Sequence, residues 1–264
     1  MLDIQQVYKT FHAGTVNAKS ALNGISVTLN DGDFVTVIGG NGAGKSTLLN
    51  SIAGSFPIDS GRILLDGIDI TRLPENKRAG FLGRVFQDPM VGTAPGMQIA
   101  ENLAIAARRG KRRTLRWGVA KGERERYYTL LKEIGLGLED RMETKVALLS
   151  GGQRQALTLL MATLQKPKLL LLDEHTAALD PNTAATVLSI TDRIVRRDHL
   201  TTIMITHNMR DALRMGNRLL MLDRGRIIFD VGAEEKARLT VDDLLEKFRQ
   251  VSATGAESDT LLLS

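Results

Sequence analysis

Apolar residues in the first ninety positions follow the two-residue period and the short continuous runs that are typical of β-strands. Strand patterns occupy residues 2–8, 25–29, 33–38, 62–66 and 81–86, and a turn signal, Asn-Asp-Gly, lies between the second and the third. After Ile38 the chain becomes rich in glycine, and from Ser46 to Ala53 the leucines and Ile52 recur with helical spacing. Around residue 40 the pattern therefore predicts a strand, a glycine-rich loop and a helix, in that order.

The middle of the chain changes to helical spacing. We expect a helical subdomain over residues 88–160, with helices at 97–109 and 123–134. Strand patterns return at 168–173 and 201–206 as continuous apolar runs, which are typical of strands buried on both faces of a parallel sheet. Between these two strands a helix is predicted over 181–197, with Asp180 as its N-cap and proline in its first turn.

Strands that alternate with helices predict an α/β fold with a mostly parallel sheet. We expect one domain over residues 1–250, with a core formed by 1–87 and 161–232 and a helical end at 233–250. Residues 251–264 are polar and show no burial pattern, so they are predicted to form a frayed tail.

Composition and charge narrow the class of protein. The 264 residues include no cysteine, which excludes disulfide scaffolds, thiolate metal sites and cysteine catalysis. No apolar run approaches the roughly 18 residues that a membrane-spanning helix needs. The net charge of +5 arises in one segment, 108–126, and the rest of the chain is net negative. No nucleic-acid partner is therefore expected, and this segment is either a solvated face or a contact for another anionic partner.

Residues 39–46 match the pattern G-x-x-x-x-G-K-[ST] of a phosphate-binding loop. Its glycines let successive backbone N–H groups converge on phosphate oxygens, and the following helix adds the positive end of its dipole. Lys45 supplies charge to the terminal phosphates, and the Ser46 hydroxyl can bind Mg²⁺. The alternative, a plain tight turn, is disfavoured because the motif lies between a strand and a helix. The predicted nucleotide-binding residues here are Gly39, Gly40, Asn41, Gly42, Ala43, Gly44, Lys45, Ser46 and Thr47.

Two further motifs add chemistry to this loop. Asp173 and Glu174 end an apolar strand, where a P-loop protein uses the aspartate to hold Mg²⁺ and the next glutamate to polarise water. Alone, the pair could equally be solvated acids at a strand end. In Leu149-Ser-Gly-Gly-Gln-Arg-Gln, Ser150 either caps a helix from Gln153 to Leu164 or joins a helix N-terminus that binds an anion.

The motif from Leu149 to Gln153 resembles the signature of the ATP-binding cassette (ABC) family, and the resemblance extends over about residues 1–250. It implies a P-loop NTPase core with a mostly parallel sheet, an N-terminal antiparallel β subdomain and an inserted α-helical subdomain. It also implies ATP and Mg²⁺ as ligands, with Ser46, Gln87 and Asp173 at the metal.

The family's remaining motifs can be matched one at a time. Gln87 is similar to the Q-loop glutamine, although it could also be a solvated turn residue. His207 resembles the switch histidine that contacts the γ-phosphate, the alternative being a hydrogen-bonded core histidine. Phe11 occupies the position of the aromatic residue that stacks on adenine, with Tyr8 as the other candidate. The remaining residues that the resemblance places at the nucleotide are Ser150, Gly151, Gly152, Gln153 and, in the D-loop, Asp180.

One residue departs from the family's pattern. The family usually has proline after the catalytic glutamate, whereas this chain has His175. Two interpretations follow: an ionisable ring beside the γ-phosphate that makes activity depend on pH near neutrality, or a tolerated loop residue.

The resemblance implies an ATPase that converts ATP and water to ADP and phosphate, with Glu174, His207 and Gln87 as catalytic residues. Because one chain has one P-loop and one signature, it implies a head-to-tail homodimer that encloses two Mg-ATP. It also implies transmembrane permease subunits and a peripheral position at the cytoplasmic face of the cell membrane.

Three stretches, 32–44, 83–90 and 107–118, resemble the ATPase subunits of a bacterial importer group. That group works with an extracytoplasmic solute-binding lipoprotein and a permease of the branched-chain amino-acid type, and some members are linked to aromatic amino acids. An ABC exporter motor and a soluble ABC ATPase without a transport role remain alternatives.

Overall fold

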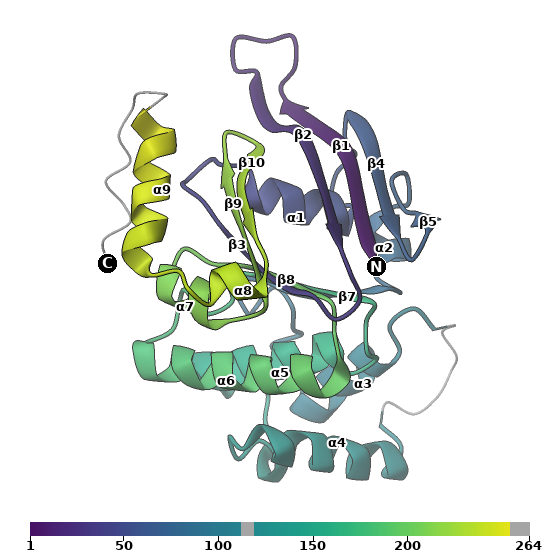
Figure 1. Cartoon of the computed structure of the whole chain (residues 1–264). Coiled ribbons are helices and arrows are strands. Elements are labelled where there is room, and N and C mark those ends of the chain that lie inside the picture. The colour runs from purple at the N-terminus through teal and green to yellow at the C-terminus, as the bar shows by residue number, and fades with distance from the viewer. Residues whose placement is uncertain (112–118, 254–264) are drawn as a thin grey trace. The chain divides into compact units, whose positions relative to one another are not determined.

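The computed structural model describes residues 1–111 and 119–253 (Figure 1). The chain consists of two compact units. Unit 1 comprises Met1–Arg78 and the segment from His199 onward, and unit 2 comprises Ala79–Asp198. Among the residues described, no helix has the length and apolar character required to cross a bilayer. Part of the basic segment 108–126, namely 112–118, lies outside the described residues.

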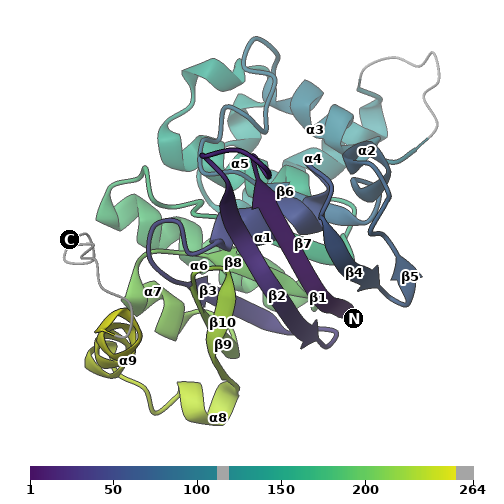
Figure 2. The ribbon, with the colours of Figure 1, turned by 90° about the horizontal axis from the view of Figure 1, so that it is seen from above.

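Unit 1 begins with an antiparallel sheet in the order β2-β1-β4-β5 (Figure 2). Its strands are β1 (Leu2–Phe11), β2 (Lys19–Leu29), β4 (Ser60–Leu65) and β5 (Ile68–Asp69). Strands β1 and β2 extend beyond the predicted 2–8 and 25–29, since cross-strand pairing with bulges continues to Phe11 and Lys19, where the apolar alternation has already ended. Pairing therefore carries both strands further than their burial pattern predicts.

A second group of strands in unit 1 holds the glycine-rich loop. Strand β3 (Phe34–Ile38) lies between β8 (Thr202–Ile205) and β9 (Arg218–Asp223), parallel to both, and β10 (Arg226–Val231) is antiparallel to β9. Every residue of β3 and β8 is buried, as the continuous apolar runs predict. The helices of this unit are α1 (Lys45–Ala53), α2 (Glu75–Arg78), α7 (Met209–Arg214), α8 (Ala233–Lys236) and α9 (Val241–Ala253).

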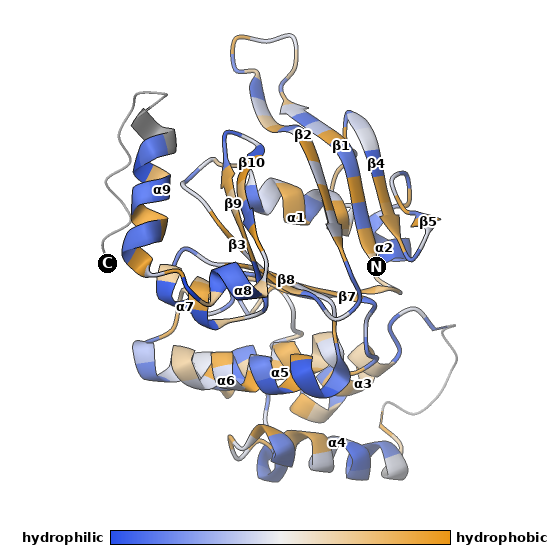
Figure 3. Ribbon diagram, in the orientation of Figure 1, coloured by the Kyte–Doolittle hydropathy of each residue, from blue (hydrophilic) through white to orange (hydrophobic). Residues whose placement is uncertain are grey.

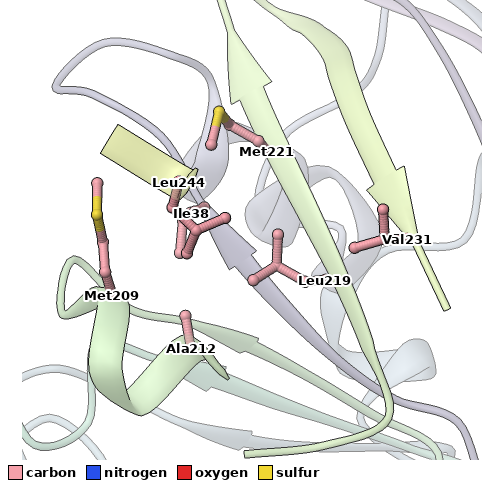
Figure 4. Packing of buried hydrophobic residues seen from close by; sticks show 7 residues of the cluster. All are labelled: Ile38, Met209, Ala212, Leu219, Met221, Val231 and Leu244. Carbon is pink, nitrogen blue, oxygen red and sulfur yellow. The ribbon is translucent and has the colours of Figure 1, made fainter. Parts of the chain in front are cut away.

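Helix α9 covers an apolar cluster that reaches the end of β3. Leu244 on α9 is fully buried and joins six other residues, Ile38, Met209, Ala212, Leu219, Met221 and Val231 (Figure 4). The helix carries both apolar and charged residues, as a surface helix does (Figure 3). It continues to Ala253, so the prediction of a tail from residue 251 is wrong by three residues, and 254–264 lie outside the described residues.

Unit 2 contains two parallel strands and the helical segment. Strand β6 (Leu82–Val85) pairs with β7 (Leu169–Asp173), and Val85 lies opposite Leu172. The helices are α3 (Ile99–Ala107), α4 (Lys121–Ile134), α5 (Gly151–Thr163) and α6 (Pro181–Asp198), with short 3-10 turns at Glu139–Arg141 and Val146–Leu148. The expected Asp180 cap is confirmed, because its Oδ1 accepts a hydrogen bond from Thr183 N at 3.1 Å.

The buried side chain of Arg78 caps the C-terminal end of α1, which is the end farthest from the glycine-rich loop. Arg78, 2% exposed, donates to the last-turn carbonyls of Ser51 and Ile52 at 2.7 and 2.8 Å. It also donates to the carbonyls of Leu73 and Thr71, each at 2.8 Å. One side chain therefore satisfies carbonyls that a helix C-terminus leaves without partners.

We expect Arg78→Met to lower the free energy of unfolding by about 3 kcal/mol or more, because several carbonyls lose a charged donor in a buried site. Urea denaturation measures the change. Lys77→Met, at an exposed position of the same helix, is the matched control and should change stability by less than about 0.5 kcal/mol. Equal stabilities of the two variants would contradict this role of Arg78.

Lys236 on α8 is a second buried cation, 4% exposed. Its ammonium donates to the Met215 carbonyl, to Thr36 Oγ1 at 3.0 Å and to the Arg218 carbonyl at 3.3 Å. Burial lowers its pKa from 10.5 to about 8. Between these two values the unfolded chain binds more protons than the folded chain, so stability rises with pH.

We expect the free energy of unfolding of the wild type to increase by about 1.5 kcal/mol more between pH 8 and pH 9.5 than that of Lys236→Met. Denaturant titrations at both pH values measure this difference, and groups that titrate alike in the two proteins cancel. Identical pH dependence would show that the Lys236 ammonium is not held out of water.

Candidate nucleotide site

The glycine-rich loop is forced into its shape by its glycines. Gly39 has φ +151°, and a Cβ there would lie 2.2 Å from the Leu222 carbonyl oxygen. Gly44 has φ +102°, and its Cβ would lie 2.4 Å from the Ala21 carbonyl oxygen. Neither position accepts a side chain, so the loop runs close to β9 on one side and β2 on the other.

The side chain of Lys45 folds back onto this loop. The side chain is 8% exposed, and its Nζ donates to the carbonyls of Gly39 at 2.7 Å and Gly40 at 3.0 Å. Gly44 is the N-cap of α1, and no side chain of the described residues caps this helix start. The first amides of α1, the positive end of its dipole and the ammonium together form an arrangement that suits a phosphate group. Ser46 is exposed at the same helix start, and Thr47 is half-buried.

Two side chains near the loop escaped the sequence analysis. The Lys19 Nζ lies 3.3 Å from where a Cβ on Gly42 would stand, and the Phe248 ring lies 3.2 Å from the corresponding point on Gly40. Lys19 begins β2 and Phe248 belongs to α9, so neither is close to the motif along the chain. No local pattern could have found them.

The two candidates for adenine stacking lie on β1. Phe11 packs edge to face on Phe56, with ring centroids 5.2 Å apart, and Lys9 Nζ lies 5.4 Å from the Phe11 ring. Tyr8 is 39% exposed, and its hydroxyl donates to Gln6 Oε1 at 3.3 Å. Both remain candidates, and Phe11 belongs to an aromatic and cationic cluster that the sequence analysis did not anticipate.

His207 follows β8 and is exposed, so the alternative of a core histidine is wrong. Its neighbours fix the backbone around it: Asn208 Oδ1 caps α7 by accepting from the amides of Arg210 and Asp211 at 2.9 and 3.2 Å. The Asn208 amide donates to Thr206 Oγ1 at 3.1 Å. The imidazole is therefore presented to solvent on a well-defined turn in unit 1.

In unit 2, three candidates share one edge of the paired strands. Because β6 and β7 are parallel, with Val85 opposite Leu172, Gln87 and the pair Asp173 and Glu174 follow the carboxyl ends of neighbouring strands. Gln87 is exposed, which fits either of its interpretations.

Strand β6 places an arginine beside the Asp173 carboxylate. Arg84 Nη2 lies 3.9 Å from Asp173 Oδ2, and its guanidinium lies 4.4 Å from the Phe86 ring. Phe86 precedes Gln87 in the chain. This arginine thus contacts both the carboxylate and the segment that leads to Gln87.

The interpretation of His175 as an ionisable ring near neutrality is wrong, and the residue lies in the turn after β7. The ring is 2% exposed, and Nε2 lies 3.1 Å from the hydroxyl of Thr191 on α6. Burial lowers its pKa from 6.5 to about 4, so the ring is neutral across the physiological range. The pH dependence expected from its titration is therefore absent near neutrality, and the residue belongs to the packed interior.

The signature motif forms the start of α5. Ser150 Oγ accepts from Gln153 N at 3.2 Å, and Gln153 Oε1 accepts from Ser150 N at 3.3 Å. Ser150 therefore caps a helix that begins at Gly151, two residues earlier than the capping alternative expected. A Cβ on Gly152 would stand 2.2 Å from Thr183 Cγ2, and one on Gly151 3.1 Å from Leu179 Cδ2. Unit 2 thus brings the signature against the D-loop segment and the first turn of α6.

The predicted residues fall into two groups. Unit 1 holds the P-loop, Phe11 and His207, whereas unit 2 holds Gln87, Asp173, Glu174, the signature motif and Asp180. Hydrogen bonds from Thr183 lower the pKa of the Asp180 carboxyl.

Comparison with known proteins identifies the family. The model of the family described as "ABC transporter" matches residues 22–177. The tyrosine transport ATP-binding protein of Clostridioides difficile is 46% identical over 248 residues, 94% of this chain and 98% of that protein. The methionine import ATP-binding protein MetN of Rhizobium etli is 37% identical over 80% of this chain, which spans only 56% of that protein.

Solved structures agree with this result. The ADP conformation of MJ1267, an ATP-binding cassette of an ABC transporter, superposes with a TM-score of 0.77 at 26% identity over 94% of this chain and 98% of that one. Dimeric MJ0796 in a post-hydrolysis state with ADP and Pi gives 0.75 at 26% identity over 88% and 99%. The expected P-loop NTPase fold, with its mixed parallel and antiparallel sheets, is confirmed. The chain therefore belongs to the ABC transporter family, in which it is an ATP-hydrolysing nucleotide-binding subunit.

Proposed function

We propose that this chain drives a bacterial importer for an amino-acid-type solute. The observation that carries this proposal is the end-to-end similarity to a tyrosine transport ATP-binding protein, supported by the import ATP-binding proteins for methionine and for spermidine/putrescine. The motifs of the chain are those of an ATP-hydrolysing subunit. We therefore assign solute recognition to separate permease and solute-binding subunits. The motor works peripherally at the cytoplasmic face of the membrane.

The proposal assigns roles to the residues around the ATP molecule within one chain. The P-loop amides and Lys45 bind the phosphates of ATP, and Phe11 stacks on adenine. Glu174 orients the attacking water and accepts its proton, Gln87 helps to place that water, and His207 donates a hydrogen bond to the γ-phosphate.

A hydroxyl, a carboxylate and an amide oxygen, from Ser46, Asp173 and Gln87, are donors that suit Mg²⁺. No cluster of three or more His, Asp or Glu side chains in the described ranges could hold a metal. With Ser46, Asp173 and Gln87 as ligands, phosphate and water oxygens would complete the coordination shell of the cation. When bound, Mg²⁺ would neutralise charge on the phosphates.

The signature motif supports a homodimer. Ser150 and the amides of Gly151 and Gly152 open a capped helix, which is an anion site. Because a chain has one such site and one P-loop, two chains arranged head to tail would enclose two ATP molecules between them. The dimeric cassette structure of MJ0796 is consistent with this arrangement.

Uptake by living cells tests the transport assignment. In a strain that lacks the gene, uptake of radiolabelled tyrosine should fall, and the wild-type gene but not Glu174→Gln should restore it. Methionine and putrescine serve as comparison solutes. Loss of uptake for one of these alone would reassign the solute, increased retention of a preloaded solute would indicate an exporter, and no change in any flux would favour a soluble ATPase.

A further inference from the structure

The catalytic candidate Glu174 sits in an unusual backbone conformation. It has φ +44°, in the left-handed region that residues with a side chain rarely adopt. Its carbonyl accepts a hydrogen bond from Ala177 N at 3.0 Å, so the turn after β7 is tight. A conformation of this kind persists only where the surroundings hold it.

His175, the residue that follows Glu174, makes a hydrogen bond through its side chain. His175 Nε2 lies 3.1 Å from Thr191 Oγ1, and both residues are buried, at 2% and 0% exposure. The Thr191 hydroxyl already donates its proton to the Val187 carbonyl at 2.9 Å. With its proton given to Val187, the oxygen accepts from the histidine, so the ring carries a hydrogen on Nε2.

Thr191, which accepts this hydrogen bond, lies on a long helix with a well-buried face. Helix α6 has eighteen residues, and Val187, Ile190, Ile194 and Val195 line its buried face. Thr191 lies in the middle of that face, one turn after Val187. A hydrogen bond to Thr191 thus links the turn after β7 to the body of unit 2 and not to a mobile loop.

We propose that His175 is a positioning residue, whose hydrogen bond to Thr191 holds the turn that aims the Glu174 carboxylate. Backbone dihedral angles set the direction of the Cα–Cβ bond, so a turn that relaxes would move the carboxylate away from the water it must orient. The inference rests on the proposed role of Glu174 in hydrolysis. It assigns a function to the residue at which this chain departs from the family's proline.

Thr191→Val is the central test because it keeps the shape of the side chain and removes the acceptor. We expect its kcat to fall on the order of 10-fold to 100-fold, as small misplacements of catalytic groups do. The Kd for Mg-ATP should stay within about twofold, since the P-loop is unchanged. His175→Ala should behave alike, and Thr191→Ser, which retains the hydroxyl, should restore kcat.

Thr186→Val is the matched control. Thr186 lies on the same helix, donates an equivalent intrahelical bond to the Asn182 carbonyl at 3.0 Å, and is exposed. It should leave kcat unchanged. A loss of activity as large as that of Thr191→Val would assign the effect to α6 in general and overturn the proposal.

Nitrogen-15 NMR of the histidine side chains reports on the hydrogen bond between His175 and Thr191 in the absence of nucleotide. The chain has four histidines, and the signal that disappears in His175→Ala identifies the relevant ring. We expect the Nε2-protonated neutral tautomer in the wild type and in Thr191→Ser, and a changed Nε2 shift in Thr191→Val. If His175→Ala fails to fold, Thr191→Val and this spectrum still test the hydrogen bond.

The outcomes separate this proposal from the role of Glu174. Full turnover by Glu174→Gln would remove the proposed function of that glutamate. An inactive Glu174→Gln together with a fully active Thr191→Val, whose NMR signal shows the bond broken, would overturn the positioning role alone.

Discussion

Lys45→Ala should hydrolyse ATP at least on the order of 10² to 10³ times more slowly than the wild type. The variant removes the ammonium that bonds the carbonyls of Gly39 and Gly40, and with it the charge that we propose stabilises the terminal phosphates in the transition state. Phosphate release at saturating Mg-ATP measures the loss.

Lys77→Ala, an exposed lysine in the same unit, controls for the loss of one charge and should retain wild-type turnover. Because Lys45 is buried, thermal unfolding must show that Lys45→Ala is folded before its rate is interpreted. A folded Lys45→Ala with wild-type turnover would remove the P-loop from the mechanism.

Glu174→Gln should lose hydrolysis by about 10²-fold to 10⁴-fold, the usual contribution of a general base, while still binding ATP. Since Lys45, Ser46 and Asp173 remain, the bound ATP should persist and the closed dimer should accumulate. Light scattering with Mg-ATP should show a dimer for this variant and mostly monomer for the isolated wild type, in which hydrolysis keeps breaking the contacts.

Adding Ser150→Arg to Glu174→Gln should return the protein to a monomer. The Ser150 hydroxyl caps α5, and an arginine there would place a bulky cation where a partner's phosphate should bind. If the single variant binds ATP and remains monomeric at tens of micromolar protein, the homodimer of the isolated chain is contradicted. A dimer that survives Ser150→Arg would show that the two chains join through another surface.

The parts of the site that depend on local chemistry were predictable. Gly39 to Ser46 shows the P-loop pattern in the spacing of its own residues, and the continuous leucines before Asp173 indicate a buried strand. The parts that depend on contacts between distant segments were not. Lys19 beside Gly42 and Thr183 against Gly152 depend on the packing of other elements, to which no local periodicity refers.

The burial of His175 was also not predictable, because it depends on a residue that is distant in the sequence. Its neighbours along the chain, two acids and a threonine, suggest a solvated loop, whereas the folded chain buries the ring to 2% exposure against Thr191, sixteen positions later. The cap by Asp180 was predictable because a helix N-cap involves residues only three apart.

The backbone joins the two units at residues 78–79 and 198–199, and both junctions are anchored. Arg78 is bonded to the carbonyl end of α1, and Asp198 is paired with Lys166 at 2.9 Å and with Arg197 at 2.7 Å. Arg78, the last residue of the first segment of unit 1, contacts one end of α1 through its own side chain, and the other end of this helix is the nucleotide loop. Within unit 1 a single nine-residue helix therefore separates the nucleotide loop from the residue at which the chain leaves this unit.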